Sequence, residues 1–576
     1  MNIKKIFLDG LINILNNKYK FNEIALENFF NNNKKTIFQI LDDPSTQTTI
    51  SRAINHLQLD KKNYLLSLVY LNLLCEKFPN NDELRLITSK TCYQCALYDM
   101  ALSHLHFISP EKYSKEHYQV LTNIYLKLEY FHECIATTKK LRLIENINST
   151  NTLILIYCLR RIRKINEAKL ELENLKRFHK NDFEFFYNET LIELLENKFS
   201  FVLDKLINAE GKYSGKEYRF HEVYSLILRK YGKFNESIDQ LKLAYSLGLN
   251  DISSYTYSLY LSKSDFSNGY LHLDRATNNI VKEKYFISID IKKWNFENLE
   301  DSTLFVYAGK GIALGDKIYF YRYLIDIISR YKGLHIFLCG DNLRDKYIFE
   351  YQNINYIKFD KINNFINVRH NNFYASLPLI VKIYNERLSI NYLKHINFLP
   401  FHKEKNNFWK REINKIDNKI KIGINWKGDI KYKLDVYRSL ELKKLKNIFE
   451  INNVTFIILN NQIDDDEEKF ISKYNNIILF DKKKFSDENQ NTFSETIEIM
   501  RNLDLIISTD TALAHLASSL NLKTFLMLEH TPFWYWELDE KNNLYNNLNL
   551  RYFKQKEPGN WDLVIKNVMN EIKTLS

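Results

Sequence analysis

The chain has 576 residues, of which 45% are hydrophobic, so it can bury the cores of several domains. It holds only 14 glycines and 7 prolines, which argues against long disordered linkers. The net charge of +11 comes from 81 lysines and arginines dispersed among 70 acidic residues, without a basic stripe or binding motif, which argues against nucleic acid as a partner.

Residues 1–44 are predicted to form a helical cap. The opening stretch MNIKKIFLDGLINILNN has two lysines, but Asp9 and Asn13 interrupt its apolar residues. This pattern is typical of an amphipathic helix rather than of a signal peptide. No apolar run in the sequence reaches the roughly 18 residues that a membrane helix needs. The six cysteines are too few for a disulfide framework in a chain of this length. We therefore expect a cytoplasmic protein without a transmembrane segment.

A repeat array is predicted over residues 45–285. Five segments align at steps of 33, 34, 34 and 35 residues, and each has a bulky second residue: Tyr98, Phe131, Ile165, Phe199 and Phe234. Three places further on, the side chains are mostly small: Ala101, Cys134, Ala168, Val202 and Ser237. A period near 34 with this alternation is typical of tetratricopeptide helix pairs, in which the small residue allows the second helix to pack closely on the first.

Weaker units around Tyr64 and Ser67 and around Phe266 and Gly269 bring the number of predicted repeats to six or seven. Stacked helix pairs offer a concave surface, and its usual use is to hold a peptide or protein. The alternative is that the array packs only against its own neighbouring domain or a second copy of the chain. Cys92 and Cys95 form a C-x-x-C pair without a second pair at ligand spacing, so we interpret them as buried helical cysteines.

From residue 286 onward, short β-branched and aromatic runs alternate with helical stretches, which predicts parallel sheets with crossover helices. The candidate strands are 303–308, 335–339, 354–359, 419–426, 454–459, 476–480, 503–508 and 523–528. Their spacing breaks at a charged connector, residues 400–418. The sequence therefore predicts two α/β lobes, 286–415 and 416–576, with a substrate cleft at the carboxyl ends of their strands.

The segment STDTALAHLASSL (508–520) is unusually rich in small residues and hydroxyls. It follows a predicted buried strand and opens a predicted helix, so Thr509, Asp510, Thr511 and Ala512 lie at the amino end of that helix. Backbone N–H groups and the helix dipole favour an anion there, and small side chains let a phosphate approach the backbone. The alternative is ordinary helix capping by Thr509 or Asp510.

Several ordered motifs in this half of the chain resemble those of bacterial tetratricopeptide-repeat glycosyltransferases of the heptosyltransferase-like class (glycosyltransferase family nine-like), which have the two-lobed GT-B fold. In the first lobe the matching segments are ALGDKIYFYRYL (313–324) and ASLP (375–378). In the second lobe they are GINWKG (423–428), DVYRSL (435–440), DLIISTDTALAHLASSL (504–520), PFWYWELD (532–539) and LRYFKQ (550–555) followed by GNWD (559–562). The resemblance implies an α-solenoid followed by two Rossmann-like lobes.

The resemblance also implies a nucleotide-sugar donor, with the second lobe as its main binding site. The implied donor-binding residues are Lys427, Arg438, Thr509, Asp510, Thr511, Ala512 and His515. In the first lobe, Asp316 matches the position of a general base for a single inverting displacement, and Gly315 and Lys317 belong to the acceptor-side loop. From its position alone, Asp316 is equally well explained as a helix N-cap.

No metal or other cofactor is expected, because a helix end and basic residues can stabilise the leaving diphosphate. The acidic run 464–466 is interpreted as a solvated turn rather than a metal-binding D-x-D motif. The chain departs from the family pattern at Ala313, Phe533 and Tyr535, where the family has Gly, Asp and Arg. Three hypotheses follow: a glycosyltransferase whose acceptor is a protein held by the repeats, a transferase that extends a cell-surface glycan, and a scaffold whose transferase lobes have degenerated.

Overall fold

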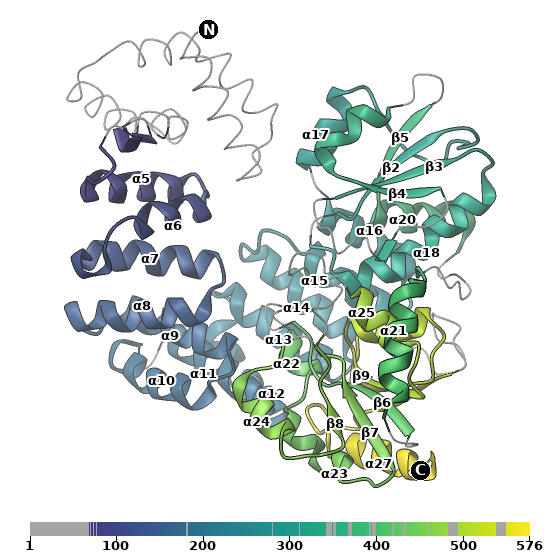
Figure 1. Cartoon of the computed structure of the whole chain (residues 1–576). Coiled ribbons are helices and arrows are strands. Elements are labelled where there is room, and N and C mark those ends of the chain that lie inside the picture. The colour runs from purple at the N-terminus through teal and green to yellow at the C-terminus, as the bar shows by residue number, and fades with distance from the viewer. Residues whose placement is uncertain are drawn as a thin grey trace. The chain divides into compact units, whose positions relative to one another are not determined.

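The structure is a computed structural model. It describes residues 68, 71–72, 74–76, 78–179, 182–278, 280–309, 311–340, 348–349, 353–366, 371–390, 393, 399–416, 420–429, 432, 434–460, 462–481, 493–536 and 549–575. The predicted helical cap and the repeat unit around Tyr64 and Ser67 lie outside these residues. The chain divides into two compact units, Met1–Ile192 and Glu193–Ser576, so the division falls within the repeats (Figure 1).

Antiparallel helix pairs make up the described part of the first unit. They are α5 (Asp82–Gln94) with α6 (Tyr98–His106), α7 (Lys115–Lys127) with α8 (Phe131–Ile144), and α9 (Ser149–Arg161) with α10 (Ile165–His179). Helix α11 (Phe183–Leu195) follows and crosses the division between the units. The second unit continues with α12 (Phe199–Tyr213), α13 (Tyr218–Lys230), α14 (Phe234–Ser246), α15 (Ser253–Ser262) and α16 (Phe266–Thr277).

The repeat pattern in the sequence corresponds to fixed places in these pairs. Each aligned bulky residue, from Tyr98 to Phe266, is the first residue of the second helix of its pair. The small residues three places further on are fully buried from Ala101 to Ser237. Two residues before each bulky residue, the turn has a left-handed backbone; the residues are Ala96, Glu129, Arg163, Asn197, Gly232 and Ser264. The turn between the paired helices therefore has one conformation throughout.

The first α/β lobe contains a five-stranded parallel sheet in the order β1-β5-β2-β3-β4. Its strands are β1 (Lys292–Lys293), β2 (Thr303–Tyr307), β3 (His335–Cys339), β4 (Ile354–Ile357) and β5 (Asn372–Ser376). Helix α18 (Leu314–Arg330) follows β2, and α20 (Leu377–Leu388) follows β5. The predicted strands at β2, β3 and β4 are confirmed, whereas β1 and β5 were not predicted.

The second lobe contains a six-stranded parallel sheet in the order β11-β10-β9-β6-β7-β8. Its strands are β6 (Ile420–Asn425), β7 (Val454–Ile458), β8 (Ile477–Ile478), β9 (Leu505–Thr509), β10 (Thr524–Leu528) and β11 (Leu550–Lys554). Helix α26 (Ala512–Ser519) follows β9, and α27 (Asp562–Leu575) ends the described chain. All five strands predicted here are present, and β11 was recognised only as a sequence motif.

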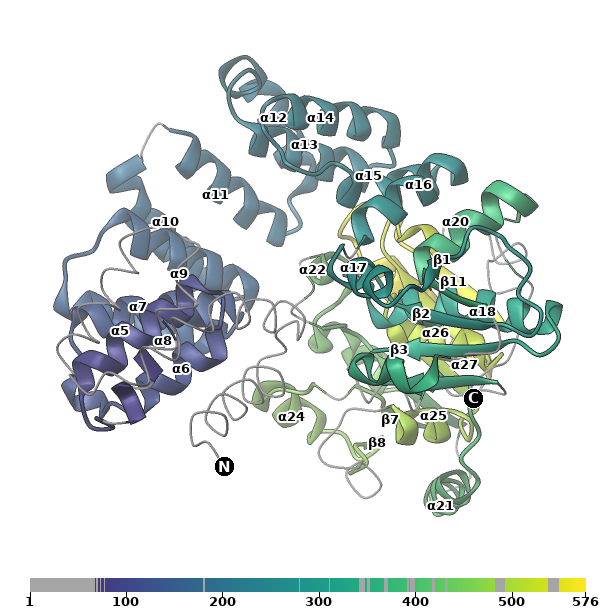
Figure 2. The same ribbon diagram turned by 90° about the horizontal axis from the view of Figure 1, so that it is seen from above.

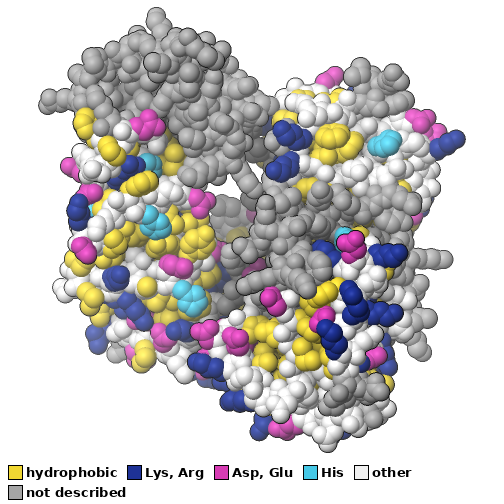
Figure 3. Space-filling model, viewed as in Figure 1, with side chains coloured by type: hydrophobic (Ala, Val, Ile, Leu, Met, Phe, Trp, Pro, Cys, Tyr) yellow, Lys and Arg dark blue, Asp and Glu magenta, His cyan; other side chains and the backbone are white. Residues whose placement is uncertain are grey.

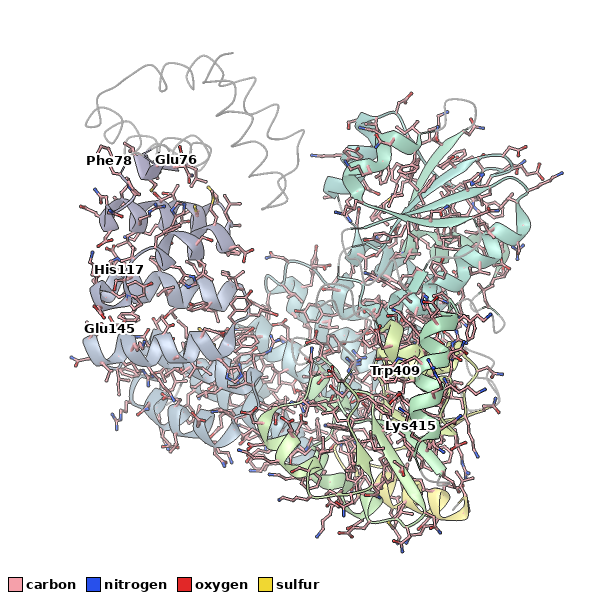
Figure 4. All side chains as sticks on the ribbon, in the orientation of Figure 1. Glu76, Phe78, His117, Glu145, Trp409 and Lys415 are labelled. Atoms are coloured by element: carbon pink, nitrogen blue, oxygen red, sulfur yellow. The ribbon has the colours of Figure 1, made fainter. Side chains whose placement is uncertain are left out.

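The predicted charged connector contains a helix, α21 (Lys403–Asn414). Trp409 on this helix is 2% exposed, and its ring centroid lies 5.2 Å from that of Phe480 (Figure 4). Lys405 lies 3.1 Å from the buried carboxylate of Glu495 on α25 (Ser494–Met500). The charged residues belong to an amphipathic helix that packs on the second lobe. Because most of its residues are charged or polar, its composition indicated only a connector.

The acidic run 464–466 is exposed to solvent, as predicted, but the prediction of a turn is wrong, because the run opens a helix. Asp464 is the N-cap of α24 (Asp465–Ile471), and its carboxylate accepts a hydrogen bond from the Glu467 N–H at 2.9 Å. The Glu467 carboxylate accepts the N–H of Asp464 at 3.2 Å in return, so the two residues form a capping box. Acidic residues in a first helical turn also interact favourably with the helix dipole.

Helix pairs are thus followed by two Rossmann-like lobes with parallel sheets, and the predicted fold class is confirmed (Figure 1, Figure 2). On the face seen in Figure 3, lysines and arginines are scattered among acidic and apolar side chains, and its described residues form no continuous basic surface. Within the described ranges, no helix is long and apolar enough to cross a membrane.

Candidate functional site

A cavity of about 390 Å³ lies within the second unit. Parallel sheets bind ligands at the carboxyl ends of the strands, at the point where the strand order reverses. In the second lobe this point lies between β6 and β9, and in the first lobe between β2 and β5. The chain after β2, β6 and β9 contributes Gly311, Ala313, Gly315, Asp316, Asn425, Lys427, Gly428, Asp429, Asp510, Thr511 and Ala512 to the cavity lining. Both reversal points therefore open onto one cavity.

Asp316 is the carboxylate that the first lobe presents to this cavity. It stands in the first turn of α18, whose N-cap is Ala313, so the prediction that Asp316 itself could be the N-cap is wrong. Its Oδ2 nevertheless accepts the Ala313 N–H at 3.1 Å, and its Oδ1 accepts a hydrogen bond from the Tyr535 hydroxyl. Burial raises the pKa of Asp316, and these two hydrogen bonds oppose the rise.

Gly315 and His515 join the amino-terminal ends of α18 and α26. A Cβ atom on Gly315 would lie 2.7 Å from Cδ2 and 3.0 Å from Nε2 of His515, so only glycine fits at this crossing. The imidazole is 3% exposed and meets the Tyr535 ring edge-on at 5.0 Å between centroids. Burial above all, and then the charges of Arg438 and Arg322, lower the pKa of His515 to about 3. His515 is therefore neutral at physiological pH and is not a proton donor there.

The segment that opens α26 has a polar network beneath it. Thr511 is the N-cap of α26 but makes no side-chain capping bond, so the alternative of capping by Thr509 or Asp510 is wrong. Its hydroxyl oxygen accepts a hydrogen bond from Asn425 Nδ2 at 3.0 Å, which leaves the hydroxyl hydrogen for Ser508, at 3.3 Å, or for a ligand. Asn460 Nδ2 in turn donates to Asn425 Oδ1 at 3.0 Å. This network fixes the strand ends, and Thr511, Ala512 and Leu513 at the start of α26 line the cavity. The first N–H groups of a helix have no partner within the helix.

Arg438 and Asp510 bring opposite charges to the second-lobe wall. Arg438 Nε lies 3.1 Å from Oδ1 of the buried Asp435, and its guanidinium lies 4.7 Å from the ring centroid of Tyr432. The Asp510 carboxylate accepts a hydrogen bond from Trp536 Nε1 at 2.9 Å. Burial raises the pKa of Asp510, and the charge of Arg438 opposes the rise. The guanidinium is thus held by Asp435 and Tyr432 at the edge of the cavity.

Lys427 lines the cavity, but its ammonium group is paired with Glu467 of α24. The same carboxylate accepts a hydrogen bond from Trp426 Nε1 at 3.0 Å. An anion in the cavity would have to compete with Glu467 for this lysine.

The structure brings together most of the predicted site residues. Those that line the cavity are Gly315, Asp316, Lys427, Arg438, Asp510, Thr511, Ala512 and His515. Thr509 is fully buried in β9 below the cavity floor, and Lys317 on α18 is not part of the lining. The role of each residue stays a prediction.

Sequence reasoning missed the contribution of the repeats. Leu226, Arg229 and Lys230 of α13 and Tyr257 of α15 line the same cavity. No motif marks them, because the repeat pattern is identified from its bulky and small packing residues alone. The three departures from the family motif, Ala313, Phe533 and Tyr535, also line it. Phe533 meets the Tyr257 ring edge-on at 6.4 Å between centroids.

No family model matches the chain, and no curated protein matches it. Among solved structures, it is similar to the glycosyl transferase family 9 protein from Veillonella parvula DSM 2008, at 11% identity and a TM-score of 0.37, over 49% of this chain and 99% of that one. It is also similar to a tetratricopeptide repeat protein from Parabacteroides merdae ATCC 43184, at 10% identity and a TM-score of 0.35, over 42% of this chain and 98% of that one.

A further similar structure is YrrB, described as a TPR protein with an unusual peptide-binding site, at 12% identity and a TM-score of 0.25, over 34% of this chain and 97% of that one. At such identities and scores these likenesses say nothing about substrate or activity. The candidate site depends on the geometry of this chain alone.

The contact between Gly315 and His515 predicts a cost for any larger residue at position 315. Gly315→Ala should lower the free energy of unfolding by about 1–3 kcal/mol, because the new methyl group overlaps a buried ring. Urea unfolding of the full chain measures the change. Gly215→Ala is the matched control, because a Cβ there meets no atom within 4 Å. Equal stability of the two variants would contradict the close approach.

The lowered pKa of His515 predicts a stability change with pH. As the pH falls from 6.5 to 5, the unfolded chain takes up a proton at this residue and the folded chain does not, so about 2 kcal/mol of stability is lost. His515→Gln should therefore show a flatter loss of stability over this range than the wild type in urea unfolding. His132→Gln, at an exposed histidine of α8, should leave the slope unchanged. Parallel slopes for the wild type and His515→Gln would contradict the buried neutral imidazole.

Proposed function

We propose that the chain is a glycosyltransferase that moves a sugar from a nucleotide-sugar donor to an acceptor hydroxyl. The observation that carries the proposal is that both lobes line one cavity, and that each contributes a different chemical group. The first lobe presents the carboxylate of Asp316, and the second lobe presents the amino end of α26 at its strand reversal point. A base that faces an anion-binding helix end is the arrangement that transfer from a diphosphate leaving group needs.

The donor diphosphate is proposed to bind at the start of α26. The N–H groups of a helix end and its dipole attract phosphate oxygens, and Ala512 leaves room for them to approach. The Thr511 hydroxyl and the Arg438 guanidinium face the same cavity and supply further donors. As the sugar bond breaks, negative charge grows on the leaving diphosphate, so these groups stabilise the transition state more than the bound donor.

Asp316 is proposed to act as the general base. In this step the acceptor oxygen attacks the anomeric carbon of the donor sugar, the bond from that carbon to the diphosphate oxygen breaks, and the acceptor proton passes to the carboxylate. The raised pKa of Asp316 brings its basicity closer to neutral pH, which favours proton transfer. The Tyr535 hydroxyl now bonded to Asp316 would have to yield this oxygen to the acceptor.

The acceptor is proposed to be a protein held by the repeats, because repeat helices α13 and α15 reach the cavity. A growing cell-surface glycan is the alternative acceptor.

A second candidate function is a non-catalytic scaffold. The contact of Tyr535 with Asp316 favours it, because the Tyr535 hydroxyl is bonded to the carboxylate that would act as the base. That candidate predicts that no nucleotide binds and that function depends only on the surface of the repeats.

The proposed donor site predicts that one class of nucleoside diphosphate stabilises the protein. At about 100 times its dissociation constant, such a ligand should add about 2.7 kcal/mol to the free energy of unfolding. Thermal shift against ADP, GDP, UDP, dTDP and their sugars measures the effect. The double variant Thr511→Ala with Arg438→Gln should lose it.

The control is Asp316→Asn, which should keep the nucleotide response because the base lies on the acceptor side of the cavity. If none of the nucleotides shifts the wild-type melting temperature, the glycosyltransferase proposal is wrong and the scaffold candidate takes its place. If a nucleotide still raises the melting temperature of the double variant, the donor binds somewhere other than the start of α26.

A further inference from the structure

Among the described residues, four cationic side chains line the cavity, and three of them are already paired with carboxylates. The pairs are Lys230 with Glu529, Lys427 with Glu467, and Arg438 with Asp435. The fourth cation is Arg229, whose guanidinium makes no hydrogen bond or ion pair with any residue in the described part of the chain. Of the described cations at the cavity, Arg229 is therefore the one whose donors are available to a ligand, and it belongs to the repeats.

Arg229 stands in the last turn of α13, beside an aromatic surface. Its guanidinium carbon lies 5.7 Å from the ring centroid of Phe533, and Phe533 in turn packs on Tyr257. The guanidinium and the Phe533 ring are within cation–π distance, and Arg229, Phe533 and Tyr257 all line the cavity. Phe533 stands where the family motif has an aspartate, so this chain has an aromatic support for the cation there in place of an ionic partner.

Arg229 and Arg438 line the same cavity, Arg229 from α13 and Arg438 from the second lobe. Tyr432, whose ring lies beside the Arg438 guanidinium, lines it as well. Burial raises the pKa of Tyr432, and the charges of Arg438 and Arg229 oppose the rise. Four carboxylates also line the cavity: Asp316, Asp429, Asp510 and Glu529. A diphosphate bound among them needs more positive charge than one arginine already shared with Asp435 can supply.

The backbone of α13 is anchored next to this residue. Lys230 is 4% exposed, its ammonium group is paired with Glu529 of the second lobe, and its carbonyl oxygen accepts a hydrogen bond from Thr531 Oγ1 at 3.1 Å. The Lys230 ammonium also lies 4.3 Å from the ring centroid of Tyr437. These contacts fix the end of the repeat helix on the donor lobe, so the position of Arg229 is set before any ligand binds.

We propose that Arg229 binds the diphosphate of the nucleotide-sugar donor, opposite Arg438, so that the repeat array supplies part of the donor site. This inference rests on the proposed function. It assigns the repeats a role in addition to acceptor recognition: the donor binds only where α13 is docked on the second lobe.

The test compares Arg229→Gln and Arg229→Lys with the wild-type full chain by isothermal titration. The probes are ADP, GDP, UDP and dTDP, each with its monophosphate and its nucleoside. Arg229→Gln should weaken the diphosphate that the wild type binds by about tenfold to a hundredfold, the effect of losing charged hydrogen bonds. Arg229→Lys should fall between it and the wild type, because lysine keeps the charge but loses the bidentate fork. Binding of the nucleoside should not change.

Arg219→Gln is the matched control, because this arginine is also on α13, lies outside the cavity lining and is 3.9 Å from Glu217. It should bind every probe like the wild type. If the wild type binds a diphosphate and Arg229→Gln binds it equally well, the inference is overturned while the proposed function stands. An equal loss of nucleoside affinity in Arg229→Gln, or an equal loss of diphosphate affinity in Arg219→Gln, would also overturn it. A wild type that binds no probe would overturn both.

Discussion

The close approach of α18 and α26 at Gly315 and His515 is the constraint on which the rest of the site depends. It brings the positive ends of two helix dipoles toward one point, where they repel each other unless negative charge lies between them. Asp316 and Asp510 line the cavity at these two helix ends, and Asp316 also accepts the N–H of Ala313 at the start of its own helix. Burial above all, and then the charges of Arg438 and Arg322, keep His515 neutral. Two helix amino ends at one cavity favour the binding of an anion between them.

The repeats and the lobes of the second unit share more than a covalent connection. Helix α13 ends in a buried ion pair with the second lobe, and residues of α13 and α15 form one wall of the cavity. Breaking such a pair by removing one partner leaves an uncompensated buried charge, so the contact favours one docked arrangement. Acceptor binding on the repeats and donor binding in the cavity would then act on neighbouring parts of one rigid framework.

The sequence predicted most of the fold because its signals are local. A period near 34 marks the repeat helices, and continuous apolar runs mark buried parallel strands. Strand β1 has two residues and no such run, and α21 was missed because its charges hide a single buried face around Trp409. Among site residues, those at strand ends could be predicted, since parallel sheets place them at one edge. Arg229 could not, because its role comes from the docking of α13, which no local pattern encodes.

The proposed glycosyltransferase must break the bond between a sugar and a nucleoside diphosphate in this cavity. The most direct measurement is release of nucleoside diphosphate from a panel of nucleotide sugars by the full chain, with water as the acceptor, for the wild type and Asp316→Asn. We expect slow release from one donor by the wild type and a rate about 10²–10⁴ times lower for the variant, with donor affinity unchanged. Equal rates for the two proteins, or no release from any donor that binds, would contradict it.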